Sequence, residues 1–132
     1  MKTIFVLQTV IFLMVTLLCA SASAQQKNLT CVLVSVDGIP GVWGQEIHIT
    51  LDEANSQAKS DDRAHDDGNF HPARFTPTTV KWTGGIVNYS SAGRIIPFGP
   101  LSYDLSRTTG VLLQGIDQLD HHYQCEVAQQ KF

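Results

Sequence analysis

The most regular feature of the sequence is an alternation of apolar and polar residues between positions 101 and 127. The apolar positions of this alternation are Leu101, Tyr103, Leu105, Tyr123, Cys125 and Val127. A period of two buries one face of a β-strand, and the polar segment Arg107–Gly110 is typical of a reversal between two strands. The stretch therefore predicts a β-hairpin followed by a closing strand that carries Cys125.

The first 24 residues have the order of a secretory signal peptide. Lys2 precedes an uncharged run over residues 4–20, and the small residues Ala22-Ser23-Ala24 then form an A-x-A-like cleavage site. A membrane anchor is the competing interpretation, because the run is nearly long enough to span a bilayer. The small residues at the end of the apolar run and the absence of a basic stop-transfer cluster favour cleavage. We expect a secreted or periplasmic protein with no membrane span after cleavage.

Residues 25–132 are enough for one domain with a single modest core. Without Lys2 this segment carries eight basic and twelve acidic side chains and no basic cluster. Nucleic acid and anionic membranes are therefore poor partners for it, because both attract basic surfaces. A protein ligand in the cell envelope or outside the cell is the partner class that remains.

Cys31 and Cys125 lie near the two ends of the domain, and Cys19 leaves with the signal peptide. An even number of cysteines in an oxidising compartment indicates one disulfide. The alternatives are a metal site, which needs more thiolates at close spacing, and a reactive pair, which usually reads C-x-x-C. Closing a loop of about ninety residues would stabilise the fold by about 4 to 5 kcal/mol.

The pattern elsewhere is also that of short strands separated by turns. Residues 29–36 are rich in β-branched and apolar side chains, and residues 46–52 alternate strictly. Gly84-Gly85 between two apolar runs predicts a hairpin into residues 86–89. Residues 52–69 predict a long loop with at most one strand or helical turn. We expect an all-β domain of six to eight antiparallel strands, either a small sandwich or a partly closed barrel.

The densest group of candidate ligands lies in the polar loop. A hard cation such as calcium prefers oxygen ligands, and this loop offers several carboxylates together with imidazoles. The candidate metal ligands are Asp61, Asp62, His65, Asp66, Asp67 and His71. The segment lacks the alternation and the terminal Glu of an EF-hand loop, so a solvated acidic loop is the competing explanation.

No catalytic motif appears in the sequence. It contains no G-x-S-x-G elbow, no H-E-x-x-H and no phosphate-binding glycine loop, although serines, histidines and aspartates are abundant. We therefore expect a non-enzymatic protein without a cofactor. Asn28 and Asn88 begin N-glycosylation triplets, which matter only in a eukaryotic host.

The C-terminal third contains Tyr103-Asp104-Leu105-Ser106-Arg107-Thr108-Thr109-Gly110, then Tyr123-Gln124-Cys125, and ends on Lys131-Phe132. In this order the segment 82–132 resembles small exported bacterial proteins of uncharacterised function that carry Y-x-[IL]-x-R-x-T-G and Y-x-C. The resemblance implies a signal peptide, a compact β-domain and a bacterial envelope setting. It carries no catalytic residue.

A second, weaker resemblance is to periplasmic lysozyme inhibitors, which are also small disulfide-tied β-proteins. They insert a short loop into an enzyme cleft. Ser90, Ser91 and Arg94 lie in a Gly-containing segment that fits this role. The sequence thus predicts an exported binding protein, with inhibition of a secreted hydrolase and metal binding as alternatives.

Overall fold

The computed structural model describes residues 25–41, 44–85, 88–91, 94–97, 101–116 and 118–128. The predicted signal peptide, residues 1–24, lies outside the described residues. Every regular element described is a β-strand. The strands are β1 (Lys27–Val36), β2 (Ile39–Pro40), β3 (Glu46–Asp52), β4 (Gln57–Ser60), β5 (His71–Phe75), β6 (Thr79–Thr83), β7 (Asn88–Ser91), β8 (Arg94–Pro97), β9 (Leu101–Ser106), β10 (Val111–Ile116) and β11 (Leu119–Val127).

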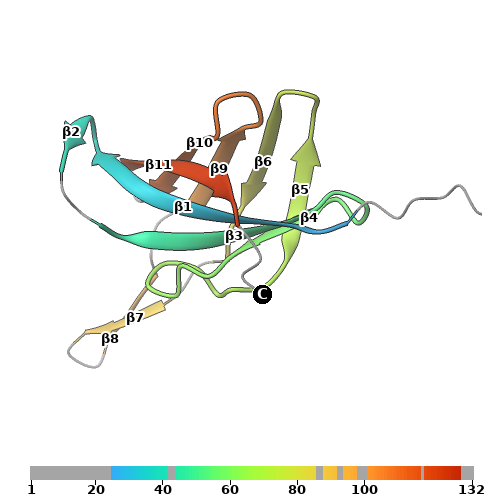
Figure 1. Ribbon diagram of the computed structural model, residues 1–132. Helices are drawn as coiled ribbons and strands as arrows, with labels where there is room; N and C mark the ends of the chain where they lie inside the picture. Colours follow the sequence, from blue (N-terminus) through green and yellow to red (C-terminus); the bar gives the residue numbers. More distant parts are fainter. Residues whose placement is uncertain are drawn as a thin grey trace, which may run out of the picture.

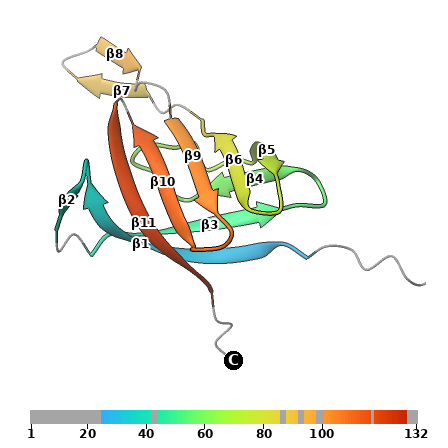
Figure 2. The same cartoon turned by 90° about the horizontal axis from the view of Figure 1, so that it is seen from above.

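Eight of these strands form a closed antiparallel barrel. Their order is β1-β3-β4-β5-β6-β9-β10-β11, and β11 pairs with β1 to close the ring. The short strand β2 adds to β1 outside this ring, and β7 and β8 form a separate two-stranded sheet (Figures 1 and 2). The prediction of an all-β antiparallel domain is confirmed, and the structure is a barrel rather than a sandwich.

The predicted disulfide joins the first and last strands of the barrel. Cys31 on β1 lies directly opposite Cys125 on β11, with an S–S distance of 2.04 Å and a Cα–Cα distance of 4.0 Å. Both side chains are buried among the apolar residues of the interior. The bond therefore fixes the strand pair on which closure of the barrel depends.

Alternate residues of each strand fill the barrel. An eight-stranded barrel is just wide enough for its own side chains, so large inward residues pack it fully. Trp82 and Tyr103 stack inside with ring centroids 4.6 Å apart, and Leu112 is the inward residue of the apolar run 111–113. The inward set also includes Leu29, Leu33, Ile47, Ile49, Leu51, Ala58, Val80, Leu101, Leu105, Ile116 and Tyr123. At about 25 cal/mol per Å² of apolar surface, this burial is the main stabilising term.

The segment expected to be a long loop contains β4. Its inward residues, Ala58 and Ser60, are small and give no apolar signal, yet both are buried. Asp52 at the end of β3 stabilises the turn between β3 and β4. Its carboxylate accepts hydrogen bonds from the side-chain amides of Asn55 and Gln57, both at 2.9 Å. These hydrogen bonds hold the tight turn after which β4 pairs antiparallel with β3.

The predicted hairpin around Gly84-Gly85 is wrong. Strand β6 pairs with β5 and β9, whereas β7 pairs with β8. The backbone N–H of Gly84 donates to the carbonyl of Leu101 at 3.0 Å, so the β6–β9 ladder continues one residue beyond Thr83 and Ser102, up to the point where the segment with β7 and β8 leaves the barrel.

Candidate functional site

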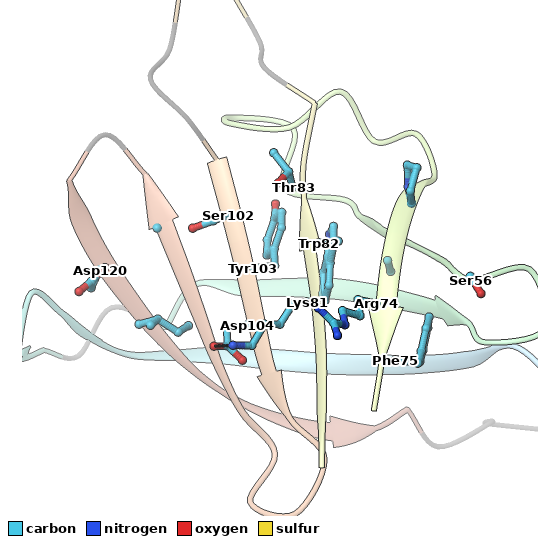
Figure 3. Close-up of a pocket in the computed structure, with 14 residues that line it drawn as sticks. Ser56, Arg74, Phe75, Lys81, Trp82, Thr83, Ser102, Tyr103, Asp104 and Asp120 are labelled. Atoms are coloured by element: carbon cyan, nitrogen blue, oxygen red, sulfur yellow. Dashed lines mark ion pairs between the residues drawn. The ribbon is translucent and has the colours of Figure 1, made fainter. Parts of the chain in front are cut away.

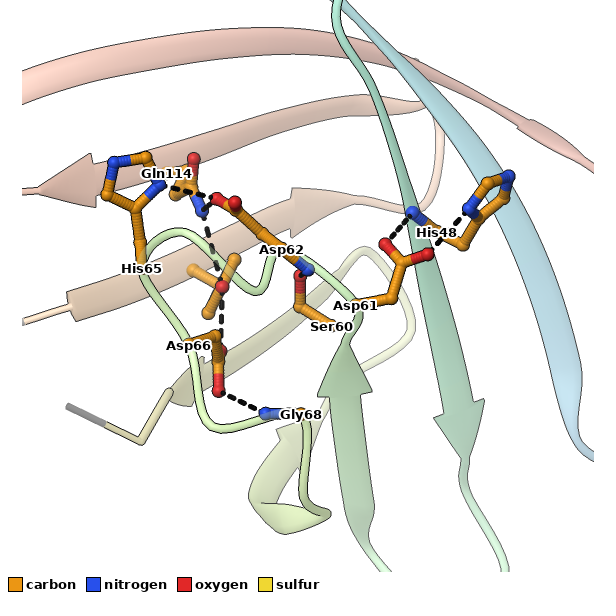
Figure 4. Close-up of polar contacts among 9 residues, drawn as sticks. His48, Ser60, Asp61, Asp62, His65, Asp66, Gly68 and Gln114 are labelled. Atoms are coloured by element: carbon orange, nitrogen blue, oxygen red, sulfur yellow. Dashed lines mark hydrogen bonds and ion pairs between the residues drawn. The ribbon is translucent and has the colours of Figure 1, made fainter. Parts of the chain in front are cut away.

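The acidic loop, residues 61–70, lies over one end of the barrel. It connects the end of β4 to the start of β5, and in an antiparallel barrel this is also the end where β6 stops and β9 begins. The loop is highly charged, yet Asp62 and Asp66 are only 4% and 2% exposed. Buried carboxylates need hydrogen-bond donors, and here the donors include Tyr103 and Gln114 of the barrel interior (Figure 4).

Asp66 is held by three donors from three segments. The Tyr103 hydroxyl donates to Oδ2 at 2.8 Å, and the backbone N–H groups of Gly85 and Gly68 donate to Oδ1 at 3.2 and 3.3 Å. A Cβ atom at Gly84 would collide with the Asp66 carboxylate, and one at Gly85 would collide with that of Asp67. The two glycines therefore allow the close approach of the acidic loop, instead of forming the predicted turn.

Asp62 is held by a second set of donors. The Gln114 side-chain amide, which is fully buried, donates to Asp62 Oδ2 at 2.8 Å and lies 3.3 Å from the Tyr103 hydroxyl. The ring Nδ1 of His65 lies 2.9 Å from the same oxygen, and the Asp62 N–H donates to Ser60 Oγ at 3.1 Å. Gln114 and Tyr103 thus connect the two buried aspartates into one network.

The surroundings shift the pKa values of this network in different directions. Burial raises the pKa of Asp66, although its three donors oppose the shift. Burial also raises the pKa of Tyr103, so its hydroxyl stays a donor. The hydrogen bond from His71 at 2.8 Å lowers the pKa of Asp67 to about 2. Asp67 is therefore ionised at any ordinary pH.

The structure divides the predicted metal ligands into three groups. Asp61 lies apart and accepts hydrogen bonds from the N–H and ring of His48 at 2.6 and 2.7 Å. Asp62 and His65 belong to the buried network. The third group consists of Asp66, which is also part of that network, Asp67 and His71, and each of these candidates offers an atom within 4.8 Å of the others. Two carboxylates and one imidazole are suited to a divalent cation.

Sequence reasoning missed two members of the network. The sequence pattern places Tyr103 among the apolar positions of an alternating strand, and Gln114 belongs to no recognisable motif. A signal for Gln114 did exist, because it occupies an inward position between Leu112 and Ile116. A polar residue at such a position must find a buried partner, which here is a loop about fifty residues away along the chain.

A trough of about 1010 Å³ crosses the outer face of β5, β6, β9 and β10 (Figure 3). The side chains of Arg74, Lys81, Thr83, Ser102 and Asp104 line it, and these residues alternate with the buried ones of the same strands. Lys81 and Asp104 lie opposite each other and form an ion pair at 3.4 Å. The trough thus combines both signs of charge with hydroxyl groups.

The strands β7 and β8 form a hairpin that extends away from the barrel (Figures 1 and 2). They pair only with each other among the described strands. The predicted binding residues lie beside its tip, where Ser91 is opposite Arg94 and Ser90 is opposite Ile95. The hairpin leaves the barrel between Thr83 and Ser102, which also line the trough.

Comparison with protein-family models, with curated proteins and with solved structures finds no match for this chain. Within the ranges described above, no helix is long and apolar enough to cross a membrane.

Proposed function

We propose that the chain is an exported, non-enzymatic binding protein whose outer trough takes a segment of another protein. The observation that carries this proposal is the trough itself. Its volume of about 1010 Å³ is at the upper end of the range for ligand sites, about 300–1,000 Å³. The disulfide and the signal-like N-terminal segment support export.

The chemistry of the trough favours a polypeptide over other ligands. Arg74 and Lys81 are countered by Asp104 and by Asp120 at one end, so the surface attracts neither anions nor cations as a class. The hydroxyls of Thr83 and Ser102 can exchange hydrogen bonds with a peptide backbone. Mixed polar groups around some apolar surface, such as Leu113 and Phe75, are typical of non-obligate protein interfaces.

A panning experiment with phage-displayed peptides on the immobilised protein tests this proposal. Peptides selected by the wild type should lose binding to Lys81→Glu, which reverses a charge in the trough. They should keep binding to Lys27→Glu, which makes the same change on β1, four strands away from β6 in the eight-stranded ring. Failure to select any sequence, or equal binding by Lys81→Glu, would refute the proposal.

The hairpin formed by β7 and β8 makes a secreted hydrolase such as lysozyme the first partner to examine. A protruding hairpin beside a trough can enter an enzyme cleft while the trough contacts its rim. Excess protein should then slow lysozyme, and replacing residues 87–99 with a short Gly-Ser linker should abolish the inhibition. Full lysozyme activity in the presence of excess wild-type protein would exclude this partner.

The cluster of Asp66, Asp67 and His71 favours a second function, the binding of a divalent cation. The cation would take the place of the hydrogen bond between His71 and Asp67 and needs a deprotonated imidazole and ionised carboxylates, so its affinity should fall as the pH is lowered. Calorimetry with Ca²⁺ and Zn²⁺ should show binding that Asp67→Asn removes and Asp61→Asn retains. An absence of heat with both ions would rule out this function.

A further inference from the structure

The end of the barrel opposite the acidic loop contains a second cavity. Its volume is about 230 Å³, and it lies where β1 begins and where β3, β5, β9 and β11 end. Antiparallel order places all of these termini at one end of the barrel, away from residues 61–70. Mouths of β-barrels are frequent sites for small ligands.

The walls of this mouth cavity are apolar. Leu29, Leu51, Leu105 and Cys125 line it, and each is less than a tenth exposed. Phe75 closes one side and packs partly against the same core. The cavity is therefore an extension of the barrel interior that opens to solvent, and it is suited to a short hydrocarbon group.

The rim of the cavity carries an excess of positive charge. Arg107 is fixed there, because its guanidinium donates to both Glu53 oxygens at 3.2 and 3.0 Å and to the Thr76 carbonyl at 2.8 Å. The charge of Glu53 is thus neutralised by Arg107. Lys27 also lines the cavity, and none of the ion pairs found in the described part of the chain involves it.

We propose that the mouth cavity binds a small amphipathic carboxylate, with its apolar tail among the leucines and its carboxylate at Lys27. Among the described residues that line the cavity, Lys27 and Arg107 are the cations, and the one carboxylate, Glu53, is paired with Arg107, so the charge favours an anionic head group. The volume lies just below that of drug-sized sites, about 300–1,000 Å³, which limits the tail to a short chain or one ring. Phe75 lines both this cavity and the outer trough, but the inference does not depend on the function proposed for the trough.

Calorimetry with sodium octanoate tests the inference, with octanol and octylamine as comparison ligands of the same tail. Octanoate should bind more tightly than either, and raising the salt concentration should weaken octanoate alone. Lys27→Glu should weaken octanoate by about tenfold or more, the effect of losing a charge-assisted contact. Lys81→Glu, which makes the same change in the trough, should leave octanoate affinity unchanged.

A second variant tests the position of the tail. Val127 is 67% exposed on the rim, so Val127→Trp can cover the cavity without disturbing the core, and it should weaken octanoate and octanol alike. Amide NMR shifts on adding octanoate should cluster at Lys27, Leu51 and Leu105. The proposal is overturned if octanoate gives no heat, if octylamine binds as tightly, or if the shifts map to the outer trough.

Discussion

Two glycines at the end of β6 decide how closely the acidic loop approaches the barrel. The space beside Gly84 and Gly85 is occupied by the carboxylates of Asp66 and Asp67. The Gly85 N–H is also one of the donors to Asp66. The absence of side chains at Gly84 and Gly85 leaves room for the loop, and the Gly85 N–H gives the buried Asp66 carboxylate a hydrogen-bond donor.

We predict that Gly85→Ala destabilises the protein by about 1–3 kcal/mol, because the added methyl group must displace the Asp67 carboxylate. Urea unfolding measures this change in free energy. Thr83→Ala, an exposed change two residues away, should stay within about 0.5 kcal/mol of the wild type. Equal stabilities for Gly85→Ala and the wild type would mean that the loop does not pack as described.

The Asp67–His71 pair predicts a pH dependence. The folded pKa of Asp67, about 2, is below its ordinary value, so ionised Asp67 stabilises the folded state above about pH 4. This contribution is lost as the pH falls through about 2. The difference in unfolding free energy between the wild type and Asp67→Asn should therefore shrink between pH 5 and pH 2. A difference that stays constant over this range would contradict the assignment.

At the scale of elements, the acidic loop and the barrel depend on each other. Tyr103 and Gln114 are buried polar groups on β9 and β10, and the loop supplies carboxylates that accept hydrogen bonds from the Tyr103 hydroxyl and the Gln114 amide nitrogen. Without the loop both donors would lose their carboxylate acceptors, at a cost of about 1–3 kcal/mol for each donor left without a strong partner. The loop therefore closes this end of the barrel independently of any cation.

Tyr103→Phe tests this dependence. The change keeps the stacking on Trp82 but leaves Asp66 with one donor fewer, and we expect a loss of about 1–3 kcal/mol. Chemical denaturation gives the value, and hydrogen exchange should show faster exchange in residues 61–70. Unchanged stability together with unchanged exchange would show that the hydroxyl bond is dispensable.

The hairpin formed by β7 and β8 has the opposite relation to the barrel. No described barrel strand pairs with it, and Gly84 and Leu101 are already hydrogen-bonded where it leaves. Replacing residues 87–99 with a short Gly-Ser linker should therefore keep the melting temperature within a few degrees of the wild type. A large fall in melting temperature would show that the hairpin supports the barrel.

At the scale of the whole molecule, closure depends on strands from the two ends of the domain. β1 and β11 pair over most of their length, and the disulfide spans 94 residues. Contacts between such distant segments are slow to form, because loop closure must precede them. The covalent bond removes much of this entropy from the unfolded state.

Replacing both Cys31 and Cys125 with serine should lower the free energy of unfolding by about 4–5 kcal/mol, from the length of the closed loop. Denaturation of the variant measures the loss. The wild type treated with a reducing agent is the matched control, and it should lose a similar amount. Reduction without any loss of stability would contradict a structural role for the bond.

The sequence alone determined the all-β class, the disulfide and most strand positions, because a period of two and a pair of cysteines are local or countable signals. Only the tertiary structure decided between sandwich and barrel, revealed β4, and gave Gly84 and Gly85 their role. It also divided the six predicted metal ligands and joined Asp62 and Asp66 to Gln114 and Tyr103. The physical reason is that strand order and buried polar pairing depend on contacts between residues far apart in the chain, and no local pattern encodes them.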